Sequence, residues 1–259
     1  MEYVSAIVLA AGRGLRFSRP NSFTPGGGIP PSVRRYAGRA KVSKPLVKID
    51  SQPLIIYCLK TLSSHLYIKD IVLVVNAENK EAIVREIARY KITKIKRVVM
   101  GGPRRQDSVK SGLKAQGAYA DLVLIHDAAR PFIDKGMVGS VIREAQTCGA
   151  AIVGVPVKAT IKQVIRSGGQ EARSRFAVEK TLDRSRLWEI QTPQVFKKDL
   201  ILRAYKKFAS HTEVTDDAML VERLGVKVSI VLGSYNNIKI TTPEDLVLAQ
   251  GIAKKWNIG

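Results

Sequence analysis

The sequence predicts an α/β protein in which a mostly parallel sheet carries helices on both faces. Three observations support this fold class: short apolar runs recur along the chain, helical patterns lie between them, and polar or glycine-bearing segments follow the runs. Alternation of strands and helices at this spacing is typical of a parallel sheet. In such Rossmann-like sheets the ligand binds at the carboxyl ends of the strands, so the functional residues are expected just after the apolar runs.

The expected strands are short and apolar, which is typical of strands buried on both faces. They are Ala6–Ala11, Ile71–Asn76, Val98–Gly101, Leu122–His126, Ala151–Val155 and Val228–Leu232. The segments between them show helical patterns. These expected helices are Pro53–Ser63, Lys80–Tyr90, Asp107–Gln116, Lys135–Thr147 and Leu200–Ala209. We interpret residues 1–259 as a single domain built on this alternation.

Two segments break the alternation. Arg19–Lys41 is rich in glycine and proline and lacks a hydrophobic period, so we expect residues 19–41 to be a flexible insertion, either a lid or dispensable. Val157–Phe196 alternates apolar and polar residues around Ser167-Gly-Gly169, which predicts a β-hairpin that projects from the parallel sheet. Because an exposed hairpin must hide its edges, we interpret about residues 157–190 as a dimerisation arm.

The composition indicates a globular protein of the cytoplasm. Hydrophobic residues make up 45% of the chain, yet no apolar run reaches the roughly 18 residues that span a bilayer. The chain starts directly with a strand pattern, so we expect no signal or transit peptide and no membrane partner. Cys58 and Cys148 lie in apolar contexts without metal-ligand spacing, which is typical of free thiols in a reducing compartment.

The net charge of +21 is unusual, and much of it is local. The stretch from Arg13 to Lys48 contains only basic charged residues. Such a field attracts anions, which include nucleotides, nucleic acids and acidic membranes. Aromatic residues are not interleaved with the basic ones as they are in proteins that stack bases, so we expect no specific nucleic-acid partner.

The segment after the first expected strand indicates a phosphate-binding loop. Ala10–Gly12 are small enough for a ligand to approach the backbone, and Arg16 supplies charge for a polyphosphate. A dinucleotide site fits badly, because Phe17 stands where the third glycine belongs and no acid follows until Asp50. A P-loop also fails, because no Gly-Lys-Ser/Thr follows. A plain strand-to-helix turn is the alternative.

Two further segments are candidates for anion binding. Pro45 is expected to hold Lys44 extended, so that its ammonium reaches back toward the first loop; an ordinary surface lysine is the alternative. Gly101–Ser108 follows an expected strand and opens a helix, whose free N–H groups can bind an anion or a base edge. Simple capping of that helix by Asp107 or Ser108 is the alternative.

The segment from His126 to Pro131 is more specific. An acid at the end of a strand, followed by small residues and an arginine, suits a divalent cation together with a phosphate. Asp127 is therefore the candidate ligand for Mg²⁺ or another divalent cation, and a structural ion pair between Asp127 and Arg130 is the alternative. His126 is a candidate general base, although a lone histidine at a strand end is more often structural.

The last expected helix begins near Pro243. Thr241 or Thr242 fits as its cap and Pro243 fits its first position, which leaves Lys239 without a capping role. The sequence Thr215–Asp217 is interpreted as the cap of another helix.

These segments, in this order, resemble the 2-C-methyl-D-erythritol 4-phosphate cytidylyltransferase family. The resemblance runs from Ala6 to about Ala249. It rests on Leu-Ala-Ala-Gly-x-Gly-x-Arg, Lys-Pro, Gly-Gly-x-x-Arg-x-Asp-Ser-Val, His-Asp-Ala-Ala-Arg-Pro, Thr-Pro-Gln-x-Phe, Thr-Asp-Asp and Asn-Ile-Lys-x-Thr-x-Pro-Glu-Asp-Leu. The chain departs from the family pattern at residues 19–41, which separate Arg16 from Lys44, and at Pro103, where the family often has an acid.

The resemblance implies a homodimer that joins CTP to methylerythritol phosphate and releases pyrophosphate, in non-mevalonate isoprenoid biosynthesis. It implies catalytic residues that face the phosphates, namely Arg16, Lys44 and Lys239. It implies a nucleotide site made of Ala10, Ala11, Gly12, Gly14, Gly102, Ser108 and Asp127. It implies a polyol-phosphate site made of Arg130, Thr160, Arg184 and Thr192, with the arm residues Thr160 and Arg184 reaching into the partner's site.

Two alternatives to this function remain open at the level of sequence. A ribitol-5-phosphate cytidylyltransferase shares most of these motifs, although the arm segment Leu182–Trp188 looks more like the methylerythritol enzyme. A nucleic-acid-binding protein would use the basic N-terminal third instead.

The nucleophile implied by the resemblance is a phosphomonoester, largely dianionic at pH 7 because its second pKa is about 6. Such a nucleophile needs no general base.

Overall fold

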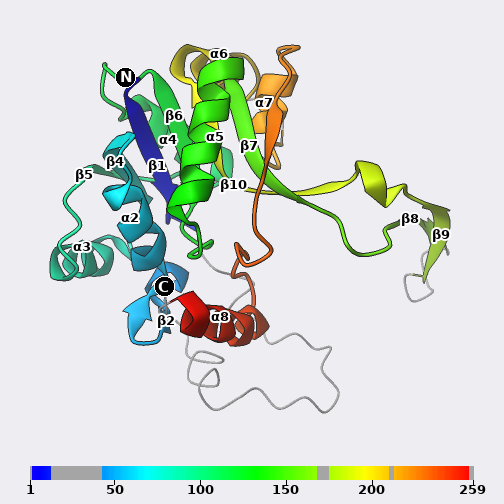
Figure 1. Cartoon of the computed structure of the whole chain (residues 1–259), viewed down its shortest axis with the longest axis horizontal. Coiled ribbons are helices and arrows are strands. Elements are labelled where there is room, and N and C mark those ends of the chain that lie inside the picture. The colour runs from blue at the N-terminus through cyan, green and yellow to red at the C-terminus, as the bar shows by residue number, and fades with distance from the viewer. Residues whose placement is uncertain (1, 13–42, 168–174, 210–212, 257–259) are drawn as a thin grey trace.

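A mostly parallel seven-stranded sheet forms the centre of the computed structural model, which describes residues 2–12, 43–167, 175–209 and 213–256 (Figure 1). Its strand order is β11-β7-β10-β6-β1-β4-β5. The parallel strands are β1 (Val4–Leu9), β4 (Ile68–Val75), β5 (Ile95–Met100), β6 (Leu122–Asp127), β7 (Ala150–Pro156) and β11 (Ser229–Leu232). These strands confirm the predicted fold class. The expected insertion at 19–41 lies outside the described residues.

Helices cover both faces of the sheet, as the alternation of side chains along the strands requires. On β4, Ile71 and Leu73 pack on one face with α2 and α5, whereas Val72 and Val74 pack on the other with α4, α6 and α7. The helices are α2 (Leu54–Ser64), α3 (Lys80–Arg89), α4 (Arg105–Lys114), α5 (Lys135–Cys148), α6 (Lys198–Phe208), α7 (Ala218–Glu222) and α8 (Pro243–Trp256). Within the described ranges, every helix is too short or too polar to cross a membrane.

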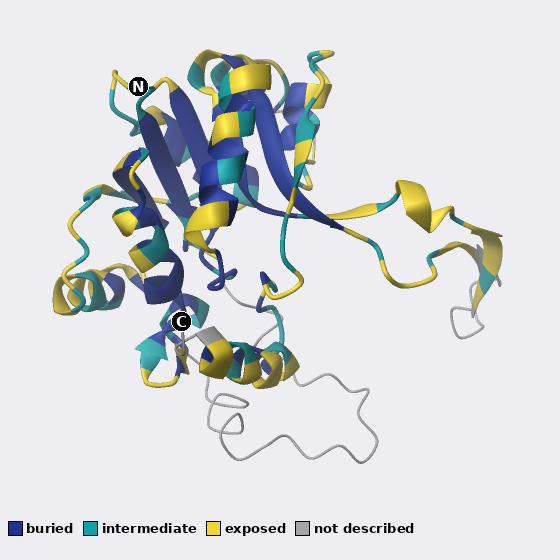
Figure 2. Ribbon diagram, viewed as in Figure 1, coloured by how far each residue is buried: buried dark blue, intermediate teal, exposed yellow. Residues whose placement is uncertain are grey.

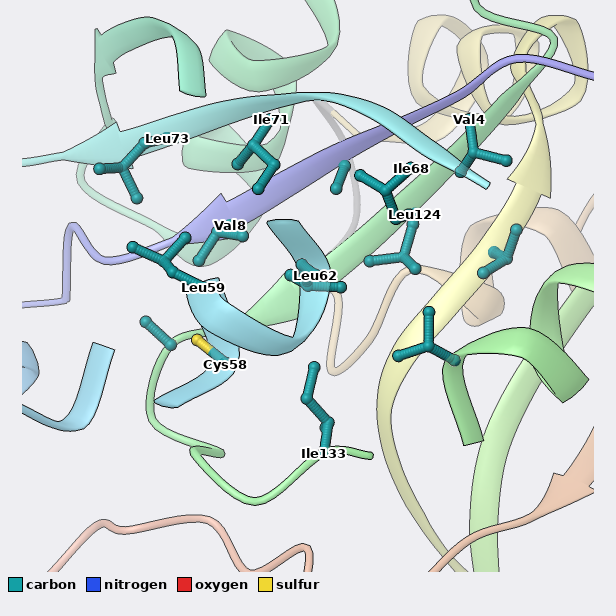
Figure 3. Packing of buried hydrophobic residues seen from close by; sticks show 14 of the residues in the cluster. Val4, Val8, Cys58, Leu59, Leu62, Ile68, Ile71, Leu73, Leu124 and Ile133 are labelled. Carbon is teal, nitrogen blue, oxygen red and sulfur yellow. The ribbon is translucent and has the colours of Figure 1, made fainter. Parts of the chain in front are cut away.

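The buried faces of strands and helices meet in an aliphatic core. Figure 3 shows Leu59 and Leu62 of α2 lying against Val8 of β1 and Leu124 of β6. Figure 2 shows the same pattern: the inner strands of the sheet are buried, whereas the edge strands β5 and β11 are partly exposed, and the covering helices expose their outer faces. The sheet is thus a rigid base for the loops at its edges.

A smaller cluster lies beyond the carboxyl edge of the sheet. The short strands β2 (Lys48–Ile49) and β3 (Gln52–Pro53) pair with each other, and α8 packs beside them (Figure 1). Ile49, Phe132 and Leu246 belong to its core, so residues from three distant parts of the sequence are joined there. This packing fixes the segment from Asn237 to Ile240, which leads into α8.

A two-stranded arm projects from the body of the molecule, as expected for residues 157–190 (Figure 1). It consists of β8 (Lys162–Ser167) and β9 (Arg175–Thr181), followed by a short 3-10 turn, η2 (Arg184–Arg186). Phe176 is 67% exposed and Val178 is 61% exposed, which are high values for large apolar side chains.

The sequence prediction was wrong for the last part of this segment. Residues up to Phe196 were expected to stand apart from the sheet, but β10 (Trp188–Lys197) enters it and runs antiparallel between β6 and β7. Val195 and Phe196 are fully buried there. Gln194 and Thr192, which interrupt the apolar pattern, are buried through hydrogen bonds that no local pattern could reveal.

The order of the strands creates a crevice beside β1. The chain moves outward from β1 to β4 and β5, and then returns to place β6 on the other side of β1. Loops at the carboxyl ends of two such strands leave in opposite directions, and ligands bind in the space between them. The ends of β1 and β6 carry Ala10–Gly12 and Asp127, so the topology brings the two main predicted segments to one place.

Candidate active site

The first loop and the start of α4 lie in direct contact. The N–H of Ala10 donates to the carbonyl of Val74 at 2.7 Å, which continues the pairing with β4 past the end of β1. A Cβ atom at Gly101 would overlap both the Cβ of Ala11 and the Oγ of Ser108, so only glycine permits this approach. The N–H of Gly102 donates to Ser108 Oγ at 3.2 Å. The structure therefore brings together Ala10, Ala11, Gly102 and Ser108, four of the residues predicted for the nucleotide.

Asn79 joins this loop to the segment that carries Lys44. Its amide Nδ2 donates to the carbonyl of Ala10 at 2.8 Å and to Ser43 Oγ at 3.0 Å. Asn79 is fully buried, and it lies just beyond the carboxyl end of β4. The sequence analysis missed this residue, although its position after an apolar run was a usable signal.

Lys44 starts a 3-10 turn, η1 (Lys44–Leu46), instead of adopting the extended conformation that was expected from Pro45. Pro45 occupies an early position of the turn, where its fixed φ and missing N–H are tolerated. The turn still follows directly on Ser43, which Asn79 holds beside the first loop. Gly12 lies at the end of the described part of this loop, and Gly14 and Arg16 fall outside the described residues.

Asp127 at the end of β6 holds two cations. Its Oδ1 accepts a hydrogen bond from Arg105 Nε at 3.1 Å, and its Oδ2 accepts one from Lys239 Nζ at 2.6 Å. Burial alone would raise the pKa of Asp127, but Arg105 and Lys239 together hold it well below its usual range. Asp127 is therefore ionised, and the basic cluster carries a fixed negative charge at its centre.

The alternative ion pair between Asp127 and Arg130 is not formed. Arg130 is buried, and its guanidinium donates to two backbone carbonyls, those of Asn237 at 2.7 Å and Ile190 at 3.3 Å. These two bonds tie the end of β6 to β10 and to the segment that precedes Lys239. Arg130 lines the cleft beside Asp127, so its predicted contact with a substrate phosphate stays a prediction.

His126 belongs to a buried hydrogen-bond chain that orients the end of β6. The Thr192 hydroxyl accepts the N–H of Asp127 at 3.1 Å and lies 2.9 Å from His126 Nδ1. The Arg130 carbonyl can only accept, so His126 Nε2–H donates to it at 3.0 Å, and Nδ1 of the neutral ring then accepts the Thr192 hydroxyl. Burial lowers the pKa of His126 to about 4. This histidine has a structural role and does not face the cleft.

We expect this neutral histidine to make folding stability depend on pH. Its pKa is depressed in the folded protein, so the unfolded chain takes up a proton as the pH falls through about 6.5 while the folded protein does not. Stability is lost progressively from there down to pH 4, by about 3 kcal/mol in total. Urea unfolding at pH 7 and pH 4.5 measures this loss. His126→Gln cannot titrate, so its loss should be smaller by more than about 2 kcal/mol; an equal loss in both proteins would contradict the assignment.

A cleft of about 420 Å³ opens over this cluster. It contains four of the predicted site residues, Asp127, Arg130, Thr192 and Lys239. Its other lining residues were not predicted as site residues; they are Arg105, Ile190, Gln191, Gln194, Thr215, Asp216, Met219 and Glu222. Asp216 also accepts the N–H of Met219 at 3.1 Å, which bears out the predicted capping role of the Thr215–Asp217 segment.

Thr160 and Arg184 do not join this cleft in their own chain. Both are exposed residues of the arm, which extends away from the body (Figure 1). The guanidinium of Arg184 donates to the carbonyl of Lys158 at 2.9 Å, which fixes the root of the arm. Their predicted role therefore requires a second chain.

A Mg²⁺ ion fits this cleft only with help from the substrate. The described residues contain no group of three or more His, Cys, Asp or Glu side chains that could hold a metal ion. Asp127 offers the remaining lone pairs of one carboxylate, although both its oxygens already bind cations. Because Mg²⁺ is usually held by one or two carboxylates together with substrate phosphates, the residues present fit that arrangement.

Small residues at the end of β1, basic side chains around one carboxylate and a Rossmann-like sheet together define a nucleotidyltransferase. The family model of 2-C-methyl-D-erythritol 4-phosphate cytidylyltransferase (IspD) matches residues 34–255. The chain therefore belongs to this family.

Individual relatives agree with the family model over almost the whole chain. The 2-C-methyl-D-erythritol 4-phosphate cytidylyltransferase of Alkaliphilus metalliredigens is 39% identical over 99% of this chain and 95% of its own. The enzyme of the same name from Shouchella clausii is 40% identical over 98% of both chains. The crystal structure of 4-diphosphocytidyl-2C-methyl-D-erythritol synthase from Anaerococcus prevotii matches with a TM-score of 0.77 and 31% identity, over 98% of this chain and 96% of that one.

Proposed function

We propose that this chain transfers the cytidylyl group of CTP to the phosphate of 2-C-methyl-D-erythritol 4-phosphate and releases pyrophosphate. The observation that carries the proposal is the cluster of Lys239, Arg105 and Asp127 in a cleft at the carboxyl end of β6, the strand next to β1. This placement presents the partly exposed Lys239 ammonium to a polyphosphate at the edge where α/β sheets bind ligands.

The first loop and the start of α4 form the proposed cytidine site. Ala10, Ala11 and Gly12 leave the backbone open to a close approach, and Gly102 and Ser108 lie next to them. The proposed triphosphate ligands are Lys44, Arg16 and Gly14 from the loop and Lys239 from the cleft. The proposed polyol-phosphate ligands are Arg130 and Thr192 in the cleft.

The chemistry requires charge and positioning more than proton transfer. The attacking phosphomonoester is largely ionised at pH 7, because its second pKa is about 6. Attack on the α-phosphorus brings two anions together and builds charge on oxygen, so fixed cations supply most of the acceleration. The neutral, buried His126 agrees with a reaction that needs no general base.

Asp127 is the proposed protein ligand of Mg²⁺. The ion would neutralise charge on the triphosphate when it is bound. Asp127 would meanwhile hold Lys239 Nζ at 2.6 Å, so one carboxylate would organise both cations.

Removal of the metal tests this assignment. We expect no turnover in excess EDTA. We expect Asp127→Asn to lose at least about tenfold in kcat even at saturating Mg²⁺, because a neutral amide binds Mg²⁺ and the Lys239 ammonium weakly. The control is Asp199→Asn, an exposed acid on α6, which should retain normal turnover. Full turnover in EDTA would refute the metal requirement, whereas full turnover of Asp127→Asn would refute only the part played by Asp127.

We also propose a homodimer located in the cytoplasm. The exposed Phe176 and Val178 on the arm are apolar surface that a second chain would cover. A partner's arm would then deliver Thr160 and Arg184 to the cleft, where a bidentate arginine suits a phosphomonoester.

One assay separates the candidate substrates. CTP is incubated with 2-C-methyl-D-erythritol 4-phosphate or with ribitol 5-phosphate, and release of pyrophosphate and the CDP-linked product are measured. We expect product with the methylerythritol phosphate and at most a trace with ribitol 5-phosphate. Preferential use of ribitol 5-phosphate would replace the proposed acceptor while leaving the enzyme class intact.

A further inference from the structure

A chain of ion pairs leads from the cleft into the core. Arg105 is the first residue of α4, and its side chain contacts carboxylates from two other parts of the sequence. Its Nε donates to Asp127 Oδ1 at 3.1 Å, and its Nη2 lies 2.8 Å from Asp217 Oδ2. Arginine presents its donors in a rigid fork, so it can bind two carboxylates at once and fix the angle between them.

Asp217, at the inner end of this series of ion pairs, is held firmly in place. Asp217 is fully buried just before α7. The hydroxyl of Tyr205 on α6 donates to Asp217 Oδ1 at 2.5 Å, and the Asp217 N–H donates to Gln194 Oε1 of β10 at 3.1 Å. Asp217 is therefore held by three separate elements and cannot shift without disturbing the core.

The outer end carries a side chain that needs to be held. The Lys239 side chain is 41% exposed, and its long flexible stem allows many positions in the cleft. Asp127 Oδ2 holds its ammonium at 2.6 Å, while Arg105 binds the other oxygen of the same carboxylate. The carboxylates of Asp217 and Asp127 alternate with the cations of Arg105 and Lys239 in this series of ion pairs, so the four charges cancel.

We propose that Arg105 is a positioning residue for the reaction, which fixes the Asp127 carboxylate through Asp217 so that Lys239 is held in its working position. This inference rests on the proposed function of Lys239. Arg105 need not touch the substrate: it acts through Asp127, and the part of its contribution that passes through Lys239 should vanish when Lys239 is absent.

A double-mutant cycle tests this directly. Arg105→Lys keeps the positive charge but cannot bind both carboxylates in the same geometry. We expect it to lower kcat at least about tenfold in the wild-type background, because small displacements of a catalytic group are costly, with KM for CTP changed far less. In the Lys239→Ala background, the same change should lower kcat by a clearly smaller factor, because only the effect on Asp127 itself then remains. Arg104→Lys, the neighbouring arginine that pairs with Asp107, is the matched control and should leave kcat unchanged in both backgrounds.

Thermal unfolding of every variant separates positioning from folding. A merely structural role of Arg105 would lower kcat by the same factor with and without Lys239, and that result would overturn the proposal. If Arg105→Lys does not fold, Tyr205→Phe takes its place in the cycle, since it loosens Asp217 without removing a charge. Failure of the proposed function is distinguishable, because it would appear as an absence of wild-type activity or as a normal kcat of Lys239→Ala alone.

Discussion

Lys239→Ala is expected to lower kcat about a hundredfold, a loss on the order of 3 kcal/mol in transition-state stabilisation. The ammonium is held at 2.6 Å from a buried, ionised Asp127 and borders the cleft, so it is available where phosphate charge develops. Lys44→Ala should have a similar effect, because Lys44 follows Ser43, which Asn79 holds beside the first loop. Steady-state kinetics with CTP and methylerythritol phosphate measure both losses.

The same variants should be folded almost normally. Lys239 is 41% exposed, and Arg105 still binds the Asp127 carboxylate after the truncation, so no buried charge is left without a partner. Thermal unfolding should therefore shift little while kcat collapses. Lys114→Ala, an exposed lysine at the end of α4, is the control for a general effect of charge and should be as active as the wild type. Near-normal kcat in both Lys44→Ala and Lys239→Ala would reject the catalytic assignment.

Local sequence patterns were sufficient to predict most of the strands of the sheet. The apolar runs that became β1, β4 and β6 are buried on both faces, so composition alone marks them as strands of a parallel sheet. The strand β10 was misassigned because it contains Thr192 and Gln194, which are buried only through hydrogen bonds to distant residues. A pattern read along the sequence contains no information about such partners.

The same limit explains which site residues were missed. Asp127 and Lys239 could be predicted, because an acid at the end of a strand and a lysine without a capping role are local signals. Arg105 and Asp217 are also polar residues at helix starts, and capping was a sufficient explanation for both positions. Their pairing at 2.8 Å depends on the first residue of α4 meeting the residue that precedes α7, which only the folded chain determines.

Arg184→Ala is expected to abolish most activity in a homodimer, because every site then lacks the arginine supplied by its neighbour. Within the described part of its own chain, the Arg184 side chain donates to the carbonyl of Lys158 at 2.9 Å, and it belongs to the arm, which projects from the body of the molecule (Figure 1). Arg184→Lys should be impaired as well, since a lysine cannot replace a bidentate contact with a phosphomonoester.

Mixing two inactive variants, Arg184→Ala and Lys239→Ala, should restore activity. In a heterodimer one site carries both lesions and the other carries neither, because the lysine and the arginine of one site come from different chains. Random exchange makes about half of the dimers mixed, each with one intact site, so activity should reach about a quarter of the wild-type value. The matched control mixes Lys239→Ala with Lys44→Ala: both lesions then act in their own chain, every site keeps one of them, and no activity should return. If heterodimers of the first pair form and stay inactive, Arg184 does not serve the neighbouring site, and the model of a site shared between two chains is wrong.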